Sequence, residues 1–329
     1  MEKFLIVPII VGFLVTLFSI PIWIRRAKKA GLVGKDMQKL DKREVAEGGG
    51  ISVLFGFVVG VLAYIAIKTF VLKTIENTTE IFALLSVVLI VGFVGFVDDI
   101  LGWKIGLTKN IRILFLIFAS IPLIVINAGE SSMMGIDFGL FYPLLLIPLG
   151  VVGASATFNF VAGYNGLETS QGILVLFGLS LFTWMTGSSW ISLIILIFVA
   201  CLIAFYLFNK YPAKVFPGDV LTYITGAMIA IIAILGNVEK IAIFFFIPYI
   251  IETGLKIRGK LKKESFAKLN SEGNLEVPYE KFYGIEHIAI YLLKKYKGVA
   301  KEKEVVYLIN LFQIIIILLG FILFGSSFY

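Results

Sequence analysis

Ten long apolar stretches, separated by short polar segments, constrain the fold of this chain more than any other feature of its sequence. They cover residues 4–24, 50–67, 80–97, 112–127, 140–158, 171–187, 189–208, 220–236, 240–257 and 305–325. A helix needs about 20 mostly apolar residues to cross the hydrocarbon core of a bilayer. A single soluble core could not enclose this much apolar surface, because 59% of the 329 residues are hydrophobic and only 16% are charged. We therefore predict an all-α polytopic membrane protein with about ten transmembrane helices and one membrane-embedded domain, residues 1–329.

The positive charges predict the orientation of these helices. With the adjoining helix ends, 25 of the 29 Lys and Arg residues fall in five segments, 25–49, 98–111, 159–170, 209–219 and 258–304. Lys3, Lys68, Lys73 and Lys240 are the other four. Cytosolic loops of membrane proteins carry the excess of Lys and Arg, so we expect the five segments in the cytosol and both termini outside. The net charge of +7 then favours contact with anionic lipid head groups over nucleic acid.

Three isolated residues are expected to have structural roles. Cys201 lies within an apolar run and is expected to be a small buried hydrophobe. Glu252, about one turn inside its run, is expected to pair with a nearby base or hydroxyl group. His287, the only histidine, falls in the amphipathic stretch 283–296, which is typical of an interfacial helix, and we expect it at the surface. The lack of a histidine cluster argues against zinc chemistry.

Polar residues that could carry chemistry gather at the predicted cytosolic helix ends. Asp98 and Asp99 close the third apolar run, Asn159 closes the fifth, Asp219 opens the eighth and Glu47 precedes the second. If the helices form a bundle, these ends converge on one cytosolic patch. Carboxylate and amide oxygens are the ligands that Mg²⁺ prefers, and Lys and Arg would balance the charge of a pyrophosphate. The patch is therefore a candidate phosphate-handling site.

Each of these residues also has an ordinary structural interpretation. Asp219 could be a helix N-cap, Asp98 and Asp99 could be solvated interfacial charges, and Asn165–Gly166 could be a turn. Their coincidence on one face of the membrane favours a shared site. Adjacent residues on a helix point about 100° apart, so only one of Asp98 and Asp99 is expected to face bound phosphates.

Five strings, taken together and in this order, resemble the polyprenyl-phosphate N-acetylhexosamine-1-phosphate transferases, glycosyltransferase family 4. The strings are Gly31–Met37, Glu47–Gly49, Gly95–Asp99, Asn159–Glu168 and Phe216–Asp219. The chain is most similar to the eukaryotic and archaeal branch, which includes the UDP-N-acetylglucosamine–dolichyl-phosphate transferase that tunicamycin inhibits. The resemblance implies transfer of N-acetylglucosamine-1-phosphate from UDP-N-acetylglucosamine to a polyprenyl or dolichyl phosphate. This reaction releases UMP and is the first step of lipid-linked glycan assembly for N-glycosylation.

The resemblance also implies roles for individual residues. Asn159 and Asp219 match the ligands of Mg²⁺, with Mn²⁺ as an alternative ion, and the catalytic group would be Asp98, Asp99 and Arg112. The residues implied for substrate binding are Lys35, Asp36, Met37, Glu47, Lys109, Gly163, Asn165, Glu168, Phe216, Lys263 and Ser265. Lys109 competes with Arg112 for the position of the basic residue that follows the aspartate pair. Lys263 and Ser265 stand where eukaryotic members carry an Arg-His-Arg-like stretch.

Alternative functions follow from the same residues. The first is the same reaction with another UDP-N-acetylhexosamine, in cell-wall or surface-polysaccharide synthesis, although the missing histidine motif and Asn165 argue against the bacterial muramoyl branch. An ion-coupled transporter would instead show polar residues near the bilayer midplane, and a non-catalytic lipid-binding member would tolerate loss of Asp219. Expected partners are UDP-N-acetylglucosamine, the lipid phosphate, membrane lipids and a second copy in a homodimer.

Overall fold

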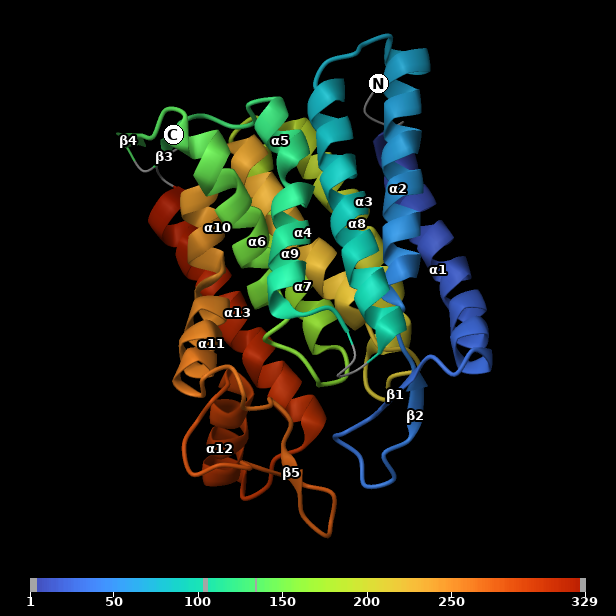
Figure 1. The fold of residues 1–329 in the computed structure, drawn as a ribbon, viewed down its shortest axis with the longest axis vertical. Helices are drawn as coiled ribbons and strands as arrows, with labels where there is room; N and C mark the ends of the chain where they lie inside the picture. Colours follow the sequence, from blue (N-terminus) through green and yellow to red (C-terminus); the bar gives the residue numbers. More distant parts are fainter. Residues whose placement is uncertain (1–4, 103–105, 134, 326–329) are drawn as a thin grey trace.

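The computed structural model describes residues 5–102, 106–133 and 135–325, and helices dominate it (Figure 1). Lys3, Phe4 and the middle of the segment 98–111 lie outside the described residues. The helices are α1 (Ile6–Lys29), α2 (Gly50–Ala66), α3 (Thr78–Leu101), α4 (Lys109–Ala119), α5 (Ile121–Val125), α6 (Ile147–Phe158), α7 (Leu167–Met185), α8 (Ser189–Asn209), α9 (Gly218–Gly236), α10 (Glu239–Phe245), α11 (Ile247–Arg258), α12 (Ile285–Lys297) and α13 (Glu302–Phe324). Two π-helical segments, η2 (Ile67–Leu72) and η3 (Tyr142–Leu146), extend α2 and precede α6.

All ten apolar runs form helices in the described part of the chain. This confirms the prediction of a polytopic membrane protein built from a helical bundle. Seven helices in the described part of the chain are long and apolar enough to cross a membrane: α1, α2 with η2, α3, α7, α8, α9 and α13. Of the other three runs, two are broken, between α4 and α5 and between α10 and α11, and the third forms one shorter continuous helix, η3 with α6, over Tyr142–Phe158. A proline stands at the second position of the helix after each break, Pro122 in α5 and Pro248 in α11. Proline lacks the N–H that continues a helical hydrogen-bond ladder, which explains why these runs divide.

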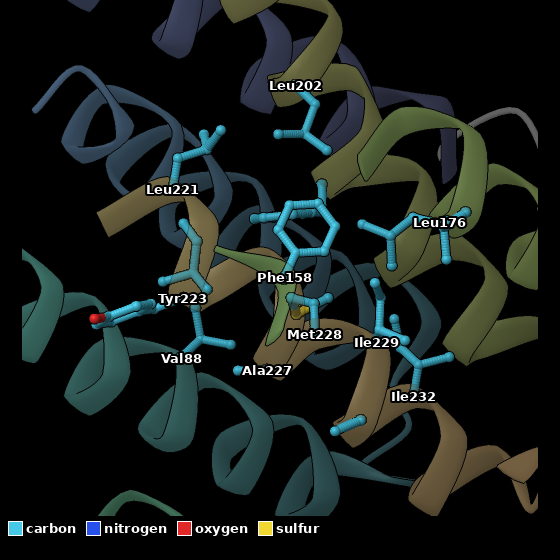
Figure 2. Close-up of a cluster of buried hydrophobic side chains, with 14 of the residues drawn as sticks. Val88, Phe158, Leu176, Leu202, Leu221, Tyr223, Ala227, Met228, Ile229 and Ile232 are labelled. Carbon is cyan, nitrogen blue, oxygen red and sulfur yellow. The ribbon is translucent and has the colours of Figure 1, made fainter. Parts of the chain in front are cut away.

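Helix α9 lies at the centre of the bundle and contacts α2, α3, α6, α7, α8 and α10. Figure 2 shows side chains of its neighbours converging on it, with Phe158 of α6 in the middle and Val88, Leu176 and Leu202 around it. Tyr223 of α9 lies at the edge of this cluster, and its hydroxyl group points away from it (Figure 2). Because almost every side chain of α9 is buried, the position of its first turn is fixed by packing on all sides.

The two ends of the bundle differ. One end, here called the loop end, carries the antiparallel hairpin β1 (Val33–Lys35) and β2 (Glu44–Ala46), the hairpin β5 (Lys268–Leu269) and β6 (Leu275–Glu276), and α12 (Figure 1). The opposite end carries the hairpin β3 (Ser132–Met133) and β4 (Ile136–Asp137), the start of α1 and the end of α13 (Figure 1). The all-α prediction is therefore wrong in detail, since the structure also contains these short hairpins. Backbone N–H and C=O groups in the segments that connect the helices need hydrogen-bond partners, and the hairpins supply them.

Helix α12 does not lie on an open surface, and the surface prediction for His287 is wrong. The helix contacts α11, α13 and β6, and the His287 side chain is fully buried. Its Nδ1 accepts a hydrogen bond from the Tyr283 backbone N–H at 3.3 Å. Burial, together with the positive charge of Lys256, lowers the pKa of His287 from 6.5 to about 4.

The two other structural predictions are confirmed. Cys201 is free and buried. The Glu252 carboxylate lies 3.5 Å from the Lys256 ammonium and also accepts a hydrogen bond from the Ile285 backbone N–H at 2.6 Å. The pair therefore joins the end of α11 to the start of α12.

Candidate phosphate-transfer site

Asp219 lies in the first turn of α9 and faces side chains from two other helices. Its Oδ1 accepts a hydrogen bond of 2.9 Å from the Asn159 amide, and its Oδ2 lies 4.0 Å from Nη1 of Arg112. The same guanidinium contacts Asp98 through Nε at 2.9 Å and donates a hydrogen bond of 3.1 Å to the Tyr223 hydroxyl. We call these five residues the acid–arginine cluster. They come from α3, α4, α6 and α9, which the bundle brings together at the loop end.

The geometry distinguishes the two basic residues that compete for one role. Arg112, in the first turn of α4, reaches both Asp98 and Asp219. Lys109 is exposed at the start of the same helix and forms no ion pair with the described residues. The Asp98 carboxylate also accepts a hydrogen bond from the Leu107 backbone N–H at 2.7 Å. It therefore contacts both the Arg112 side chain and the segment that leads into α4.

Asp99 points away from Arg112 and holds the N-terminus of α9. Its two carboxylate oxygens accept hydrogen bonds from the backbone N–H groups of Asp219 at 2.7 Å and Val220 at 3.3 Å. The first N–H groups of a helix lack partners within the helix, and a carboxylate there is also favoured by the helix dipole. The capping role considered for Asp219 therefore belongs to Asp99. Gly218, with φ of +68°, lets the backbone approach this carboxylate closely.

A second polar network joins the segment between α1 and α2 to the last helix, α13. Asp36 accepts a hydrogen bond of 3.1 Å from the Asn165 amide and lies 3.6 Å from the Lys39 ammonium. Glu302, at the start of α13, accepts a hydrogen bond of 2.7 Å from the Asn165 backbone N–H and forms an ion pair with Lys39. Arg43 completes the set at 3.5 Å from Asp36. We call Asp36, Lys39, Arg43, Asn165 and Glu302 the loop network.

The segment before α9 connects the segment between α1 and α2 to Asp219. Phe216 donates its backbone N–H to the Ala46 carbonyl at 2.7 Å, and its own carbonyl accepts from Gly49 at 2.9 Å. A β-carbon added at Gly34 would lie 3.2 Å from the Phe216 ring and 2.6 Å from the Glu47 carboxylate. Gly34, Glu47 and Phe216 therefore meet in one place. Burial raises the pKa of the Glu47 carboxyl above its ordinary value.

The loop that links α6 to α7 is held from inside. The buried Glu168 carboxylate accepts a hydrogen bond of 2.9 Å from the Gly163 backbone N–H. Gly163 has φ of +95°, and an added β-carbon would lie 2.8 Å from the Phe266 ring. Glu168 is thus directed towards the loop backbone, and the loop fixes Asn159 at one end and Asn165 at the other.

The segment between α11 and α12 contacts the same loop through Ser265. Its hydroxyl accepts a hydrogen bond of 2.5 Å from Lys256 and lies 3.4 Å from the Phe160 carbonyl. Its carbonyl accepts from the Tyr164 hydroxyl at 3.2 Å. Lys263 is exposed, with its ammonium 4.7 Å from the centre of the Tyr279 ring. The structure therefore brings Ser265, but not the Lys263 charge, against the loop that carries Asn159 and Asn165.

Two predicted residues of the segment between α1 and α2 do not belong to either network. Lys35 is exposed at the end of β1, and Met37 is half-buried beside Asp36. Among the described residues, Lys35 has no ion pair. Both positions are open to a ligand that reaches the β1–β2 hairpin.

Several residues of the two networks were not predicted. Tyr223 follows Asp219 by four positions, and side chains four apart share a helix face, so the pattern contained a signal for it. Lys39 and Glu302 were not singled out, because ion pairs between the two ends of a chain leave no mark in local sequence. Lys256, which belongs to neither network, lies within an apolar run, and nothing in the local pattern connects it with Ser265.

The charges of the acid–arginine cluster suit a divalent ion and a phosphate. Two carboxylates, those of Asp98 and Asp219, face the single guanidinium of Arg112, so negative charge is in excess. No group of three or more His, Cys, Asp or Glu side chains in the described ranges could by itself enclose a metal. Mg²⁺ does not need such a cage, because it keeps several waters and binds through one or two carboxylates together with substrate phosphates. The oxygen donors of Asn159 and Asp219 fit that mode of binding.

The chain is similar in sequence to proteins of one family. The sequence model described as glycosyl transferase family 4 matches residues 81–237. A Saccharolobus solfataricus protein, provisionally named UDP-N-acetylglucosamine–dolichyl-phosphate N-acetylglucosaminephosphotransferase, is 36% identical over 92% of this chain and 91% of its own length. A Sulfolobus acidocaldarius protein of the same provisional name is 34% identical over 82% of this chain and 83% of its own. The phospho-N-acetylmuramoyl-pentapeptide-transferase of Streptococcus pyogenes is 28% identical over 74% of this chain and 76% of its own length.

Proposed function

The chain belongs to glycosyl transferase family 4, and from that membership we propose that it transfers N-acetylglucosamine-1-phosphate from UDP-N-acetylglucosamine to a polyprenyl phosphate of the dolichyl type. It is a phosphoglycosyltransferase embedded in the membrane. The products are UMP and the lipid-linked pyrophosphoryl sugar, which begins a lipid-linked glycan for N-glycosylation. The observation that carries the proposal is the convergence of Asp98, Arg112, Asn159 and Asp219, from four helices, at the loop end of the bundle.

In the proposed reaction, a phosphate oxygen of the lipid forms a bond to the β-phosphorus of the nucleotide sugar. The bond from that phosphorus to the oxygen bridging the two phosphates breaks, and UMP leaves with the bridging oxygen. Such transfers depend mainly on positioning and on charge neutralisation. Arg112 would neutralise phosphate charge, Asp98 would orient its guanidinium, and Asp99 would hold the first turn of α9.

Mg²⁺, with Mn²⁺ as an alternative, would be held by Asn159 and Asp219. When bound, the ion would draw the donor's phosphates towards these residues and offset their negative charge. The fit rests on the oxygen donors and on the excess of carboxylates over guanidinium in the cluster.

The nucleotide sugar would lie between the two networks. The loop from Asn159 to Asn165 spans both, and Phe216 and Glu47 come from the segments that flank them. We propose that Asn165 and the Gly163 backbone contact the uridine, with Phe216 near the uracil ring. Lys35, Asp36, Met37 and Ser265 would line the rest of the site, and Lys263 would reach the pyrophosphate or sugar after leaving the Tyr279 ring.

The orientation and the full number of spans are also part of the proposal. The loop end would face the cytosol, where the 25 Lys and Arg residues gather. The two divided runs and the shorter helix Tyr142–Phe158 would complete ten crossings with both termini outside. The homodimer remains a prediction that rests on the family resemblance.

The test is transfer by the purified protein from radiolabelled UDP-N-acetylglucosamine to an added polyprenyl phosphate. We expect lipid-soluble label that requires Mg²⁺ or Mn²⁺ and is blocked by tunicamycin. Parallel reactions with UDP-N-acetylgalactosamine and UDP-N-acetylmuramoyl-pentapeptide test the alternative donors. Labelling by one of these and not by UDP-N-acetylglucosamine would overturn the assigned donor. No labelling with any donor, by a folded protein, would overturn the enzyme assignment.

A further inference from the structure

A cavity of about 420 Å³ lies at the loop end, between α1, β2 and the segment that follows α8, and neither network lines it except through Arg43. Its polar lining is strongly basic. Arg25 and Lys28 come from the last turns of α1, Arg43 precedes β2, and Lys214 follows α8. Glu44 is the only acidic residue in the lining. The cavity therefore carries a net positive charge and suits an anion.

These basic groups are largely free to bind a ligand. Arg25, Lys28 and Lys214 are exposed and form no ion pair in the described part of the chain. Nε of Arg43 is buried without a hydrogen-bond partner among the described residues, although the guanidinium lies 3.5 Å from Asp36. Guanidinium and ammonium groups that converge in this way bind phosphate well.

An apolar stripe leads from the cavity along the lipid-facing side of α1. Leu14, Phe18, Pro21, Arg25 and Lys28 are spaced by three or four residues and so share one face of the helix. Leu14 and Phe18 are 40% and 67% exposed. A ligand held by its phosphate in the cavity could therefore lay a hydrocarbon chain along this face.

We propose that this cavity binds the head group of an anionic phospholipid, with an acyl chain along α1. This cavity takes no part in the proposed transfer reaction, and the test of the proposal measures lipid binding alone. The cavity also lies against segments that build the active site. Val45 lines the cavity two residues before Glu47, and Lys214 lines it two residues before Phe216. A bound head group would stabilise the pairing of these two segments.

The test is native mass spectrometry of the purified protein in detergent micelles that contain phosphatidylglycerol or phosphatidylcholine. We expect the wild type to retain phosphatidylglycerol preferentially. Replacing Arg25, Lys28 and Lys214 together by Gln should weaken that binding about tenfold or more, and Lys28→Gln alone should lie in between. The matched control replaces their neighbours Arg26, Lys29 and Lys210 by Gln. It removes the same charge from the same chain segments outside the cavity and should bind as the wild type does.

Each outcome decides the proposal. Equal retention of phosphatidylglycerol by the wild type and the cavity variant would overturn the proposal. An equal loss of phosphatidylglycerol binding in the control variant would also overturn it, because the lipid would then be held by general surface charge. Displacement of the lipid by an excess of inorganic phosphate would assign the cavity to free phosphate instead. Retention of phosphatidylcholine as strongly as phosphatidylglycerol would remove the role of the basic residues.

Discussion

Two adjacent carboxylates at the end of α3 have different partners. Asp98 binds Arg112 inside the acid–arginine cluster, whereas Asp99 binds the first N–H groups of α9. Because side chains of neighbouring helix positions diverge, a pair that reads as one motif in the sequence is divided between the cluster and the helix that supports it. Asp219 links them, since its side chain belongs to the cluster and its backbone is held by Asp99.

Replacing Asp219 by Asn tests the centre of this arrangement. The change removes the charge but keeps the shape, so we expect kcat to fall by about 100-fold or more while the thermal unfolding midpoint stays near that of the wild type. Activity is measured as transfer to polyprenyl phosphate. The matched control is Asp137→Asn, an exposed residue at the opposite end of the bundle, which should leave kcat unchanged. A D219N variant with near-normal turnover would remove this residue from the phosphate site.

His287 gives a prediction for the effect of pH on stability. Its pKa is about 4 in the folded protein, because burial and Lys256 disfavour the charged ring, against an ordinary value of 6.5. The unfolded chain therefore binds the proton first as pH falls. The contribution of this residue to the free energy of unfolding is complete above pH 6.5 and is lost as the pH falls towards 4.

The measurement compares thermal unfolding of the wild type and His287→Gln near neutral pH and near pH 5. The wild-type midpoint should fall further between the two conditions than the midpoint of the variant. Other groups, including Glu286, whose pKa burial raises, are common to both proteins and cancel in the difference. Equal pH dependence in the two proteins would contradict a buried neutral His287.

At the scale of elements, the close approach of α3 and α9 positions the site. A β-carbon added at Gly95 of α3 would lie 2.7 Å from the Asp219 carbonyl and from Val220. We expect Gly95→Ala to separate the helices at this point, to lower the free energy of unfolding by about 1–3 kcal/mol and to reduce transfer activity. Chemical denaturation and kcat are the measurements.

Gly153→Ala is the matched control, because an added β-carbon in this part of α6 meets nothing within 4 Å. Alanine is also favoured over glycine within helices, so this variant should be as stable as the wild type or slightly more stable. If both variants behave alike, contact between α3 and α9 does not set the geometry of Asp219.

The existence of the helices could be predicted from the sequence, but their breaks and contacts could not. Apolar runs of about 20 residues indicate helices in any bundle, and all ten formed. The breaks before Pro122 and Pro248 depend on how the neighbouring helices satisfy the freed carbonyl groups. Amphipathic spacing also indicated α12, but not that it packs under a loop and buries His287.

For the candidate site, too, the sequence predicts residues but not their contacts. Residue types and their order in the chain are enough to predict Asp98, Asn159, Asp219 and Asn165 as site residues. The choice of Arg112 over Lys109 and the capping by Asp99 depend on the angle between helices, which sequence spacing does not give. The roles of the predicted residues in binding and catalysis stay predictions that the experiments above address.

At the scale of the whole molecule, the direction of insertion can be tested with engineered thiols. The only native cysteine, Cys201, is buried, so labelling will report introduced residues. We expect a membrane-impermeant maleimide to label Asp137→Cys, at the β3–β4 end, in intact cells. Glu272, exposed between β5 and β6, lies in a segment rich in positive charge that we propose to face the cytosol. Glu272→Cys should therefore be labelled only after the cells are made permeable. The reverse pattern would invert the proposed topology.

The ion pair and hydrogen bond at Glu302 have a consequence for biosynthesis. Glu302 binds Lys39 and the backbone of Asn165, so the loop network joins segments from the two ends of the chain. A ribosome delivers the N-terminal helices to the membrane first, and a nascent chain that stops before residue 302 lacks the acceptor for both groups. The loop from Asn159 to Asn165 then lacks one of the contacts that hold it, however well the earlier helices have packed. We therefore expect translation to near completion to be a condition for activity, and truncated products in the membrane to be inactive.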